Sequence, residues 1–321
     1  MRQKRRWLAL GCALMWLPAL AQVRPFPAGP ITLVVPLAPG DAADIAARAM
    51  GEELSKLLKT PVLAINRPGA GGAVGTQSVV QGRKDGHTIL FAQNSALTFR
   101  AVLDPQAATY DPLRDLLPLG TASQTPSVLV VRGDAPYRSF AELIDYAKSR
   151  PSQVRIGHPG AGSVGDFCVQ SINALTGAQL MGIPYAGAAP AIVALRGEQI
   201  EGVVLSLGAL SPHIRSGTFR GLVASSRFAD FVDIPTMREL GYHEELFSIW
   251  FSFLAPAGIP EEARKALVGA IEQAVNAPGV SSRLASLGIL QSYATPEQTT
   301  AEIRLESRRI GEMARKTGLL K

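Results

Sequence analysis

Cysteine is scarce in this chain of 321 residues, which contains only Cys12 and Cys168. Cys12 falls within the N-terminal segment that we expect to be removed on export. The single remaining thiol excludes an intramolecular disulfide and a Cys-based structural zinc site. Histidine is nearly as rare, with four residues, and their spacing is not that of metal ligands. We therefore expect no metal and no cofactor, and we expect Cys168 to be a buried small hydrophobic residue.

Beyond residue 21, runs of Lys or Arg, and basic stripes interleaved with aromatic residues, are also missing. The formal net charge is +6, from 32 basic and 26 acidic residues. Four of the basic residues and none of the acidic ones lie in residues 1–21, so the rest of the chain has 28 basic and 26 acidic residues. Such a nearly neutral chain has no electrostatic footprint for nucleic acid, and we expect no nucleic-acid partner.

Long apolar runs are confined to the N-terminus, where Trp7 to Leu20 follows a cluster of basic residues and ends at Ala19-Leu-Ala21. This run is shorter than the roughly 20 residues that span a bilayer. A basic start, a short apolar run and an Ala-x-Ala site are typical of a secretory signal peptide. We predict that residues 1–21 are cleaved after Ala21 and that the mature protein is periplasmic and has no membrane helix. An uncleaved N-terminal anchor is the alternative.

The remaining 300 residues, of a chain that is 47% hydrophobic, exceed what one core usually accommodates, so two lobes are expected. In the first part of the chain, short β-branched runs alternate with segments of helical periodicity. The predicted strands are 31–35, 62–65 and 88–91, and the predicted helices are 44–58 and 72–81. A series of this kind indicates a parallel sheet with right-handed crossovers.

The same alternation restarts after residue 121 and predicts a second doubly wound α/β lobe. Its predicted strands are 127–131, 154–157, 179–183 and 200–205, and its predicted helices are 139–149, 166–176 and 190–196. After an apolar run at 247–254, the C-terminal part is interpreted as helices at 261–276, 281–287 and 296–317, without strands of its own. We expect this block to cover the sheet of the first lobe.

Three turns between strands and helices are rich in small residues, at 36–44, 68–75 and 157–165. In open α/β sheets the ligand binds at the carboxyl ends of the strands. Free N–H groups at a helix start bind a carboxylate or phosphate, and glycine lets a ligand approach the backbone. Each turn alone is better explained as a plain turn than as a binding site. The three together favour a binding site.

Two enzyme hypotheses involve the third turn. Ala161-Gly-Ser-Val-Gly165 approaches a nucleophile elbow with Ser163 as nucleophile, so an exported serine hydrolase is the alternative function. The first glycine of that pattern is replaced by Ala161, and no acid and histidine pair follows convincingly. The same turn also contains Gly160-x-Gly162-x-x-Gly165, a formal dinucleotide fingerprint, but the chain has no acid near Tyr185 to hold a ribose.

Several motifs along the chain together resemble one known family. They include Pro36-Leu-Ala-Pro-Gly40 with Asp44, Asn66-Arg-Pro-Gly-Ala-Gly-Gly72, Asp85-Gly-His-Thr88, Tyr110-Asp-Pro-Leu-Arg-Asp115, Pro184-Tyr-Ala-Gly187, Pro212-His-Ile214 and Leu254-Ala-Pro-Ala-Gly258. In this order, from about residue 29 to the end, they resemble the extracytoplasmic solute receptors of tripartite tricarboxylate transporters, the Bug or TctC family. The resemblance implies a Venus flytrap fold of the periplasmic-binding-protein type. Its two doubly wound α/β lobes would be joined by a hinge that the chain crosses twice.

The resemblance also implies the domain limits. The first lobe would comprise 22–124 and 247–321, and the second lobe 125–246. The hinge would lie near 121–125 and 247–251.

The ligand-binding residues are likewise implied by position in the family pattern. Those of the first lobe are Leu37, Ala38, Gly40, Asp41, Ala42, Gly75, Asn94 and Ser95. Those of the second lobe are His158, Gly160, Ala161, Gly162, Ser163, Val164, Tyr185, Ala188, Ala189 and Ser206. Some positions depart from the pattern, notably Asp41, 165–167 and Leu205, the last in place of an aspartate. A carboxylate at Asp41 would repel an anion or attract an ammonium group, or it would serve as a helix cap.

These observations predict a non-enzymatic, monomeric receptor. It would capture a small carboxylate-bearing or related solute, such as a dicarboxylate, amino acid, aromatic acid or amide, between its lobes. It would then deliver the solute to the membrane permease subunits of a tripartite tricarboxylate-type transporter.

Overall fold

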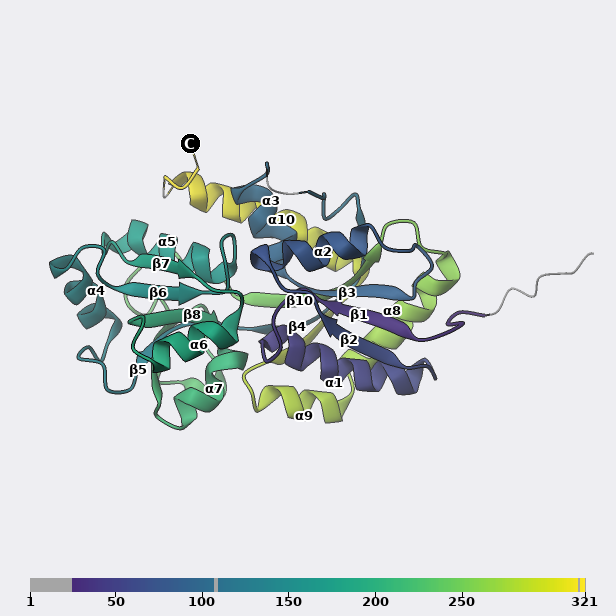
Figure 1. The fold of residues 1–321 in the computed structure, drawn as a ribbon, viewed down its shortest axis with the longest axis horizontal. Coiled ribbons are helices and arrows are strands. Elements are labelled where there is room, and N and C mark those ends of the chain that lie inside the picture. Colours follow the sequence, from purple (N-terminus) through teal and green to yellow (C-terminus); the bar gives the residue numbers. More distant parts are fainter. Residues whose placement is uncertain (1–24, 107–108, 317, 321) are drawn as a thin grey trace, which may run out of the picture.

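Two α/β lobes lie side by side along the long axis of the molecule (Figure 1). The computed structural model describes residues 25–106, 109–316 and 318–320. One lobe contains a six-stranded sheet of order β11-β4-β10-β3-β1-β2, and the other a five-stranded sheet of order β7-β6-β8-β5-β9. The predicted signal peptide, residues 1–21, lies outside the described residues. Within the described part of the chain, no helix is long and apolar enough to cross a membrane.

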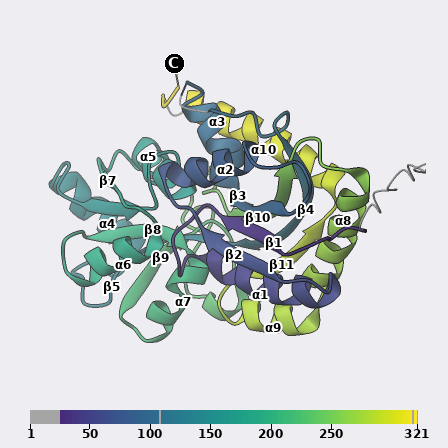
Figure 2. The ribbon, with the colours of Figure 1, turned by 45° about the vertical axis from the view of Figure 1, so that its right-hand side comes forward.

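The first sheet has the predicted parallel core. β1 (Ile31–Val35) pairs in parallel with β2 (Val62–Asn66) and with β3 (Thr88–Gln93). The crossover helices are α1 (Ala42–Leu57) and α2 (Ala73–Val80). Figures 1 and 2 show α1, α8 and α9 on one side of this sheet and α2, α3 and α10 on the other. Burial of β1 between these layers explains its run of β-branched and aliphatic residues.

Two long antiparallel strands connect the lobes. β4 (Leu116–Thr125) pairs with β10 (Ile249–Pro256) along its whole length, from Leu116 opposite Pro256 to Thr125 opposite Ile249. One residue beyond β4 the chain enters β5 (Ser127–Arg132) of the second sheet, and it returns to the first sheet at β10. The chain therefore passes between the sheets twice. The sequence did not predict β4, whose Pro118 and Gly120 interrupt the apolar pattern.

The C-terminal block contains α8 (Glu261–Val275), α9 (Pro278–Ala285), β11 (Leu290–Ala294) and α10 (Pro296–Lys316). Its helices α8 and α10 contact β4, so it covers the first lobe as predicted. The prediction that it has no strand is wrong, because β11 pairs antiparallel with β4 at the edge of the sheet. Its residues LQSYA are exposed or half-buried, so they lack the apolar alternation of a core strand.

The second sheet combines parallel and antiparallel pairs. β6 (Arg155–His158) lies in parallel between β7 (Met181–Pro184) and β8 (Gly202–Ser206), while β5 is antiparallel to β8 and to β9 (Phe219–Ala224). The helices are α4 (Phe140–Ser149), α5 (Val164–Thr176), α6 (Ala188–Arg196) and α7 (Leu207–Arg215). The predicted strands and helices are present here, and β9 was not predicted.

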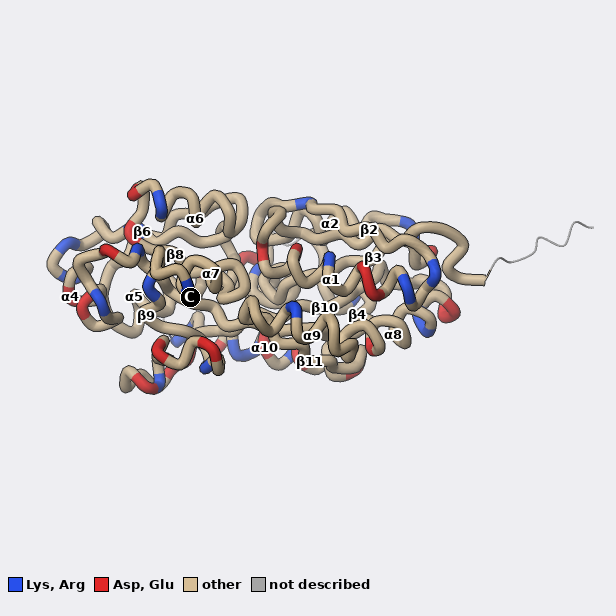
Figure 3. Tube along the Cα trace, turned by 90° about the horizontal axis from the view of Figure 1, so that it is seen from below, with Lys and Arg blue, Asp and Glu red and all other residues tan. Residues whose placement is uncertain are grey.

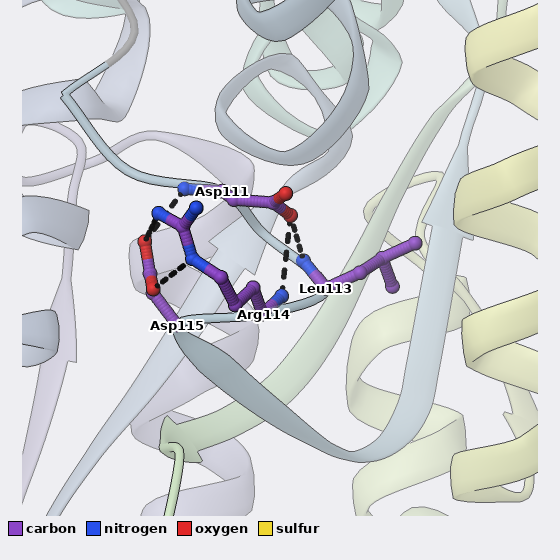
Figure 4. A network of polar contacts seen from close by, with 4 residues as sticks. All are labelled: Asp111, Leu113, Arg114 and Asp115. Atoms are coloured by element: carbon purple, nitrogen blue, oxygen red, sulfur yellow. Dashed lines mark hydrogen bonds and ion pairs between the residues drawn. The ribbon is translucent and has the colours of Figure 1, made fainter.

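The motif at 110–115 forms a turn that leads into β4 (Figure 4). Asp111 accepts hydrogen bonds from the backbone N–H groups of Leu113 and Arg114, at 2.9 and 3.1 Å. Asp115 accepts from Asp111 N at 2.8 Å and binds the Arg114 guanidinium at 2.8 and 2.9 Å. The Arg114 contact is the main cause that lowers the pKa of Asp115 to about 2. This motif therefore shapes the chain locally.

The burial of the cysteine and the distribution of charged residues agree with what the composition indicates. Cys168 is fully buried, as predicted, and its burial raises the pKa of the thiol to about 11. Lys and Arg positions are interspersed with Asp and Glu positions over both lobes (Figure 3).

Candidate functional site

The three glycine-rich turns meet where the lobes face each other. A Cβ placed on Gly71 would lie 3.1 Å from the carbonyl oxygen of Ala161, and one on Gly160 would lie 3.4 Å from Gly71 N. A Cβ on Gly187 would lie 2.8 Å from that of Ala38. These residues belong to different lobes, so the lobes are closed on each other through backbone contacts that larger side chains would prevent.

A small cavity of about 10 Å³ lies between the lobes in this closed arrangement. It is lined by Asp41, Gln93, Ser127, Pro159, Gly165, Val204, Leu205, Ser206 and Ile249. A volume of this size holds about one water molecule. A solute with a carboxylate therefore needs the lobes to separate before it enters. Asp41 and Ser206 were predicted site residues, whereas Gln93 and Ser127 were missed because neither lies in a glycine-rich turn.

In the first lobe the turn before α1 is held by two acids. Asp41 is the N-cap residue and accepts from Ala43 N at 3.2 Å. Asp44, in the first helical turn, accepts from Gly40 N at 3.0 Å and from the Asn66 amide at 2.9 Å. The same Asn66 amide donates to the Leu37 carbonyl at 3.0 Å. Two residues of the family motifs thus fix the shape of this turn.

Asp41 is both a helix cap and a cavity residue. It is 3% exposed, and burial is the main cause that raises the pKa of its carboxyl to about 6. Asp44 has a lowered pKa: burial, the largest single influence, opposes that shift and is outweighed by hydrogen bonds from Arg48, Gly40 and Asn66. The capping interpretation of Asp41 is therefore correct, and its place on the cavity wall leaves contact with a ligand open.

The second lobe repeats this arrangement before α5. Ser163 is the N-cap residue and accepts from Asp166 N at 3.1 Å, while Asp166 accepts from Gly162 N at 2.8 Å. His158 is buried, has Nδ1 3.1 Å from the Gly160 carbonyl and has Nε2 3.7 Å from Asp166 Oδ1. Burial lowers the pKa of His158, so it is neutral near pH 7. Ser163 caps a helix, and the hydrolase alternative has no support in this geometry.

A direct hydrogen bond joins the lobes at Ser95. Its hydroxyl accepts from Val164 N, across the lobe boundary, at 3.2 Å and from the Gln93 amide at 2.8 Å. The neighbouring Asn94 amide donates to Glu306 Oε1 at 2.9 Å and to the Ser248 carbonyl at 3.1 Å. Ser95 and Val164, both predicted site residues, thus link the segment that follows β3 to the start of α5.

The other predicted residues lie around the same boundary. Gly75 packs α2 against the first turn, since a Cβ there would be 2.7 Å from that of Pro36. Tyr185 is half-buried and donates its N–H to the His158 carbonyl at 2.9 Å. Ala42 and Ala188 are buried at the starts of α1 and α6, and Ala189 is exposed. Ser206 Oγ is buried on the cavity wall without a hydrogen-bond partner. No cluster of potential metal ligands occurs among the described residues.

Two α/β lobes, joined twice and closed over a cleft at the carboxyl ends of their strands, define the class of solute-binding proteins. The structure of periplasmic binding protein BugD matches with a TM-score of 0.87 and 28% identity, covering 92% of this chain and 99% of that one. MatC from Rhodopseudomonas palustris, with bound malate, matches with a TM-score of 0.84 and 28% identity, covering 90% and 99%.

Sequence comparison identifies the family within that class. The model of the tripartite tricarboxylate transporter family receptor matches residues 46–319. Protein BugT of Bordetella pertussis is 34% identical over 91% of this chain and 90% of its own length. The chain belongs to the tripartite tricarboxylate transporter receptor family and is a solute-binding receptor. The predicted family, fold class and receptor function are confirmed.

Proposed function

We propose that this protein is a non-enzymatic periplasmic receptor. It captures a small carboxylate-bearing or related solute and delivers it to the permease subunits of a tripartite tricarboxylate-type transporter. The observation that carries this proposal is one cavity shared by both lobes and lined by the first and third glycine-rich turns, with the second turn packed against both of them. Malate bound to MatC supports a carboxylate-bearing solute. Export through a signal peptide cleaved after Ala21, and a monomeric state, are parts of the same proposal.

Binding would be coupled to closure. The lobes would comprise 22–124 with 247–321, and 125–246, and they would rotate about 121–125 and 247–251. A ligand that contacts both lobes stabilises the closed form. The contacts would come from the three turns, with Ser206, Asn94 and Tyr185 completing the site. The Ser95–Val164 hydrogen bond supports this arrangement because it forms only when the lobes meet.

A thermal-shift screen tests the proposal. Residues 22–321, unfolded and refolded to remove any bound solute, are tested with dicarboxylates, amino acids, aromatic acids and amides, and hits are confirmed by calorimetry. A ligand at 100 to 1,000 times its Kd stabilises the folded form by about 3 to 4 kcal/mol. A refolded protein that binds none of these classes would contradict the proposed function.

A further inference from the structure

Glu306 is a buried acid that joins the C-terminal helix α10 to the segment after β3. The residue is 4% exposed. Its Oε1 atom accepts from the Asn94 amide at 2.9 Å and from the Trp250 indole N–H at 3.0 Å. Its Oε2 atom lies 2.7 Å from the Thr98 hydroxyl. Thr98 belongs to the π-helical turn η2 (Ser95–Phe99), and Trp250 belongs to β10. This carboxyl group therefore holds together α10, η2 and the strand that returns from the second lobe.

The Thr98 hydroxyl shows where Glu306 carries a proton. Thr98 Oγ1 lies 2.7 Å from Glu306 Oε2 and 2.9 Å from the Asn94 carbonyl oxygen, but a hydroxyl has only one hydrogen to donate. A charged carboxylate would leave one of these two oxygens without that hydrogen. A protonated carboxyl satisfies both contacts, because Oε2 donates to Thr98, which then donates to the Asn94 carbonyl. Oε1 already accepts two N–H groups, so the proton belongs on Oε2.

The segment that Glu306 holds also carries a contact between the lobes. Ser95, next to Asn94, accepts from Val164 N of the second lobe at 3.2 Å. The Asn94 amide also donates to the carbonyl of Ser248, which lies just before β10 where the chain returns to the first sheet. A π-helical turn such as η2 is rare in proteins and frequently lies at a functional site. A shift of η2 would therefore change both the site and the second connection between the lobes.

Few charged groups act on Glu306. Burial raises the pKa of its carboxyl to about 7, and the charge of Glu302, one turn earlier on α10, adds to this shift. Arg309, one turn later, lies with its guanidinium 5.5 Å from the centre of the Phe247 ring. The neighbouring elements β4, β10 and η2 contain no ionisable side chain, and α3 (Arg100–Leu103) contributes Arg100. Burial and the proton acceptor Thr98 therefore control the titration of Glu306.

We propose that Glu306 is a positioning residue whose protonated form holds η2 in the place required for closure, so that ligand and proton bind cooperatively. The inference rests on the proposed receptor function. Loss of the proton leaves a buried charge and removes the donor to Thr98, and η2 must shift to accommodate both changes. The open form allows this shift, whereas in the closed form η2 is fixed by the contact of Ser95 with Val164.

The sign of the pH dependence follows from this difference between the two forms. The carboxyl of Glu306 has the higher pKa in the closed form, so closure favours proton uptake. Affinity is therefore complete below the pKa of the open form and is lost as pH rises through that of the closed form, about 7. By reciprocity, a bound ligand raises the pKa of Glu306.

Calorimetry at two pH values tests the effect on affinity. Residues 22–321 are titrated with succinate, L-malate, L-aspartate, benzoate and nicotinamide. We expect the Kd of the wild type to rise about three- to tenfold between about pH 5.5 and 8.5, since tenfold corresponds to one pKa unit. Glu306→Gln, whose amide donates to Thr98 at every pH, lacks this rise. The control Glu312→Gln, which removes an exposed carboxyl from the same helix, keeps it. Titration of Asp41, His158 or the ligand affects all three proteins alike.

The fluorescence of Trp250 gives a second readout that needs no variant. Of the three tryptophans, Trp7 and Trp16 lie in the predicted signal peptide, so residues 22–321 contain Trp250 alone. Its indole donates to Glu306, so its emission follows the charge of that carboxyl. We expect a saturating concentration of the tightest-binding of the five compounds to move the midpoint of this titration about 0.5 to 1 pH unit higher. In Glu306→Gln the titration is absent.

An equal rise of Kd with pH in the wild type and Glu306→Gln overturns the role of Glu306 and leaves the receptor function standing. A midpoint of the Trp250 titration that the bound compound does not move has the same meaning, and it decides the question if Glu306→Gln does not fold. A wild-type protein that binds none of the five compounds at either pH contradicts both the receptor function and this inference.

Discussion

Gly208 is the position at which the closed form can be tested without disturbing either lobe. It lies in α7 of the second lobe, and a Cβ there would be 2.9 Å from the Cβ of Ala42 and 2.7 Å from Cγ1 of Ile289, both in the first lobe. Ala42 begins α1 and cannot rotate away. Alanine at position 208 favours the helix itself, but it forces the lobes apart. Overpacking of this kind costs about 1 to 3 kcal/mol, here only in the closed form.

The expected result for Gly208→Ala is a Kd about 5- to 150-fold higher, from the tenfold change per 1.4 kcal/mol, with a folded protein of unreduced Tm in the absence of ligand. Calorimetry gives the Kd, and small-angle scattering gives the fraction of closed molecules. Gly269→Ala is the matched control, because Gly269 is also helical and its Cβ would meet no atom within 4 Å. Unchanged affinity in Gly208→Ala would show that ligand binding does not require this closed arrangement.

Three further predictions concern buried polar groups. Burial raises the pKa of Glu306 to about 7, so the stability that this carboxyl group contributes is complete below about pH 4.5 and is lost as pH rises to about 7. Glu306→Gln removes this dependence of Tm on pH. Equal dependence of Tm on pH in both proteins would contradict this. Asn66→Ala removes three hydrogen bonds, to Leu37, Asp44 and Arg48, and lowers the free energy of unfolding in urea by about 1 to 3 kcal/mol, whereas no loss would mean that Asn66 does not support the turn. Asp41→Asn keeps the cap acceptor and weakens amino-acid binding more than dicarboxylate binding in calorimetry; an equal effect on both would remove Asp41 from ammonium recognition.

The sequence predicts the central strands of both parallel cores, such as β1, β3 and β8, because they are buried on both faces. β1, with one half-buried residue among five, is visible as an apolar run, and the helices after it show a regular apolar period. β11 and β9 lack such an apolar run or follow irregular segments. In β4, Pro118 and Gly120 interrupt the apolar pattern. β4 and β11 pair with partners more than a hundred residues away, such as β10 for β4, and β9 pairs with the distant β5, so local sequence carries little of that information.

The candidate site, like the fold, could be predicted only in part from the sequence. Glycine-rich turns at strand ends show where the backbone bends, and Asp41, Gly162 and Ser163 lie in these turns. Gln93 lies in ordinary sequence, and its place at the site arises from the approach of the second lobe. Glu306 is more than two hundred residues from Asn94 and Thr98, yet it accepts from them at 2.9 and 2.7 Å. No periodicity indicates such a contact.

The mirrored turns bear on the charge of the ligand. In each lobe an acid in the first helical turn, Asp44 or Asp166, accepts the N–H of a glycine with positive φ, at 3.0 and 2.8 Å. The positive ends of α1 and α5 are therefore already compensated by protein carboxylates. An anion drawn to these helix starts would be repelled by Asp41, Asp44 and Asp166, whereas a zwitterion or neutral amide would not. We therefore expect the pair of acids to favour solutes whose negative charge is balanced within the molecule.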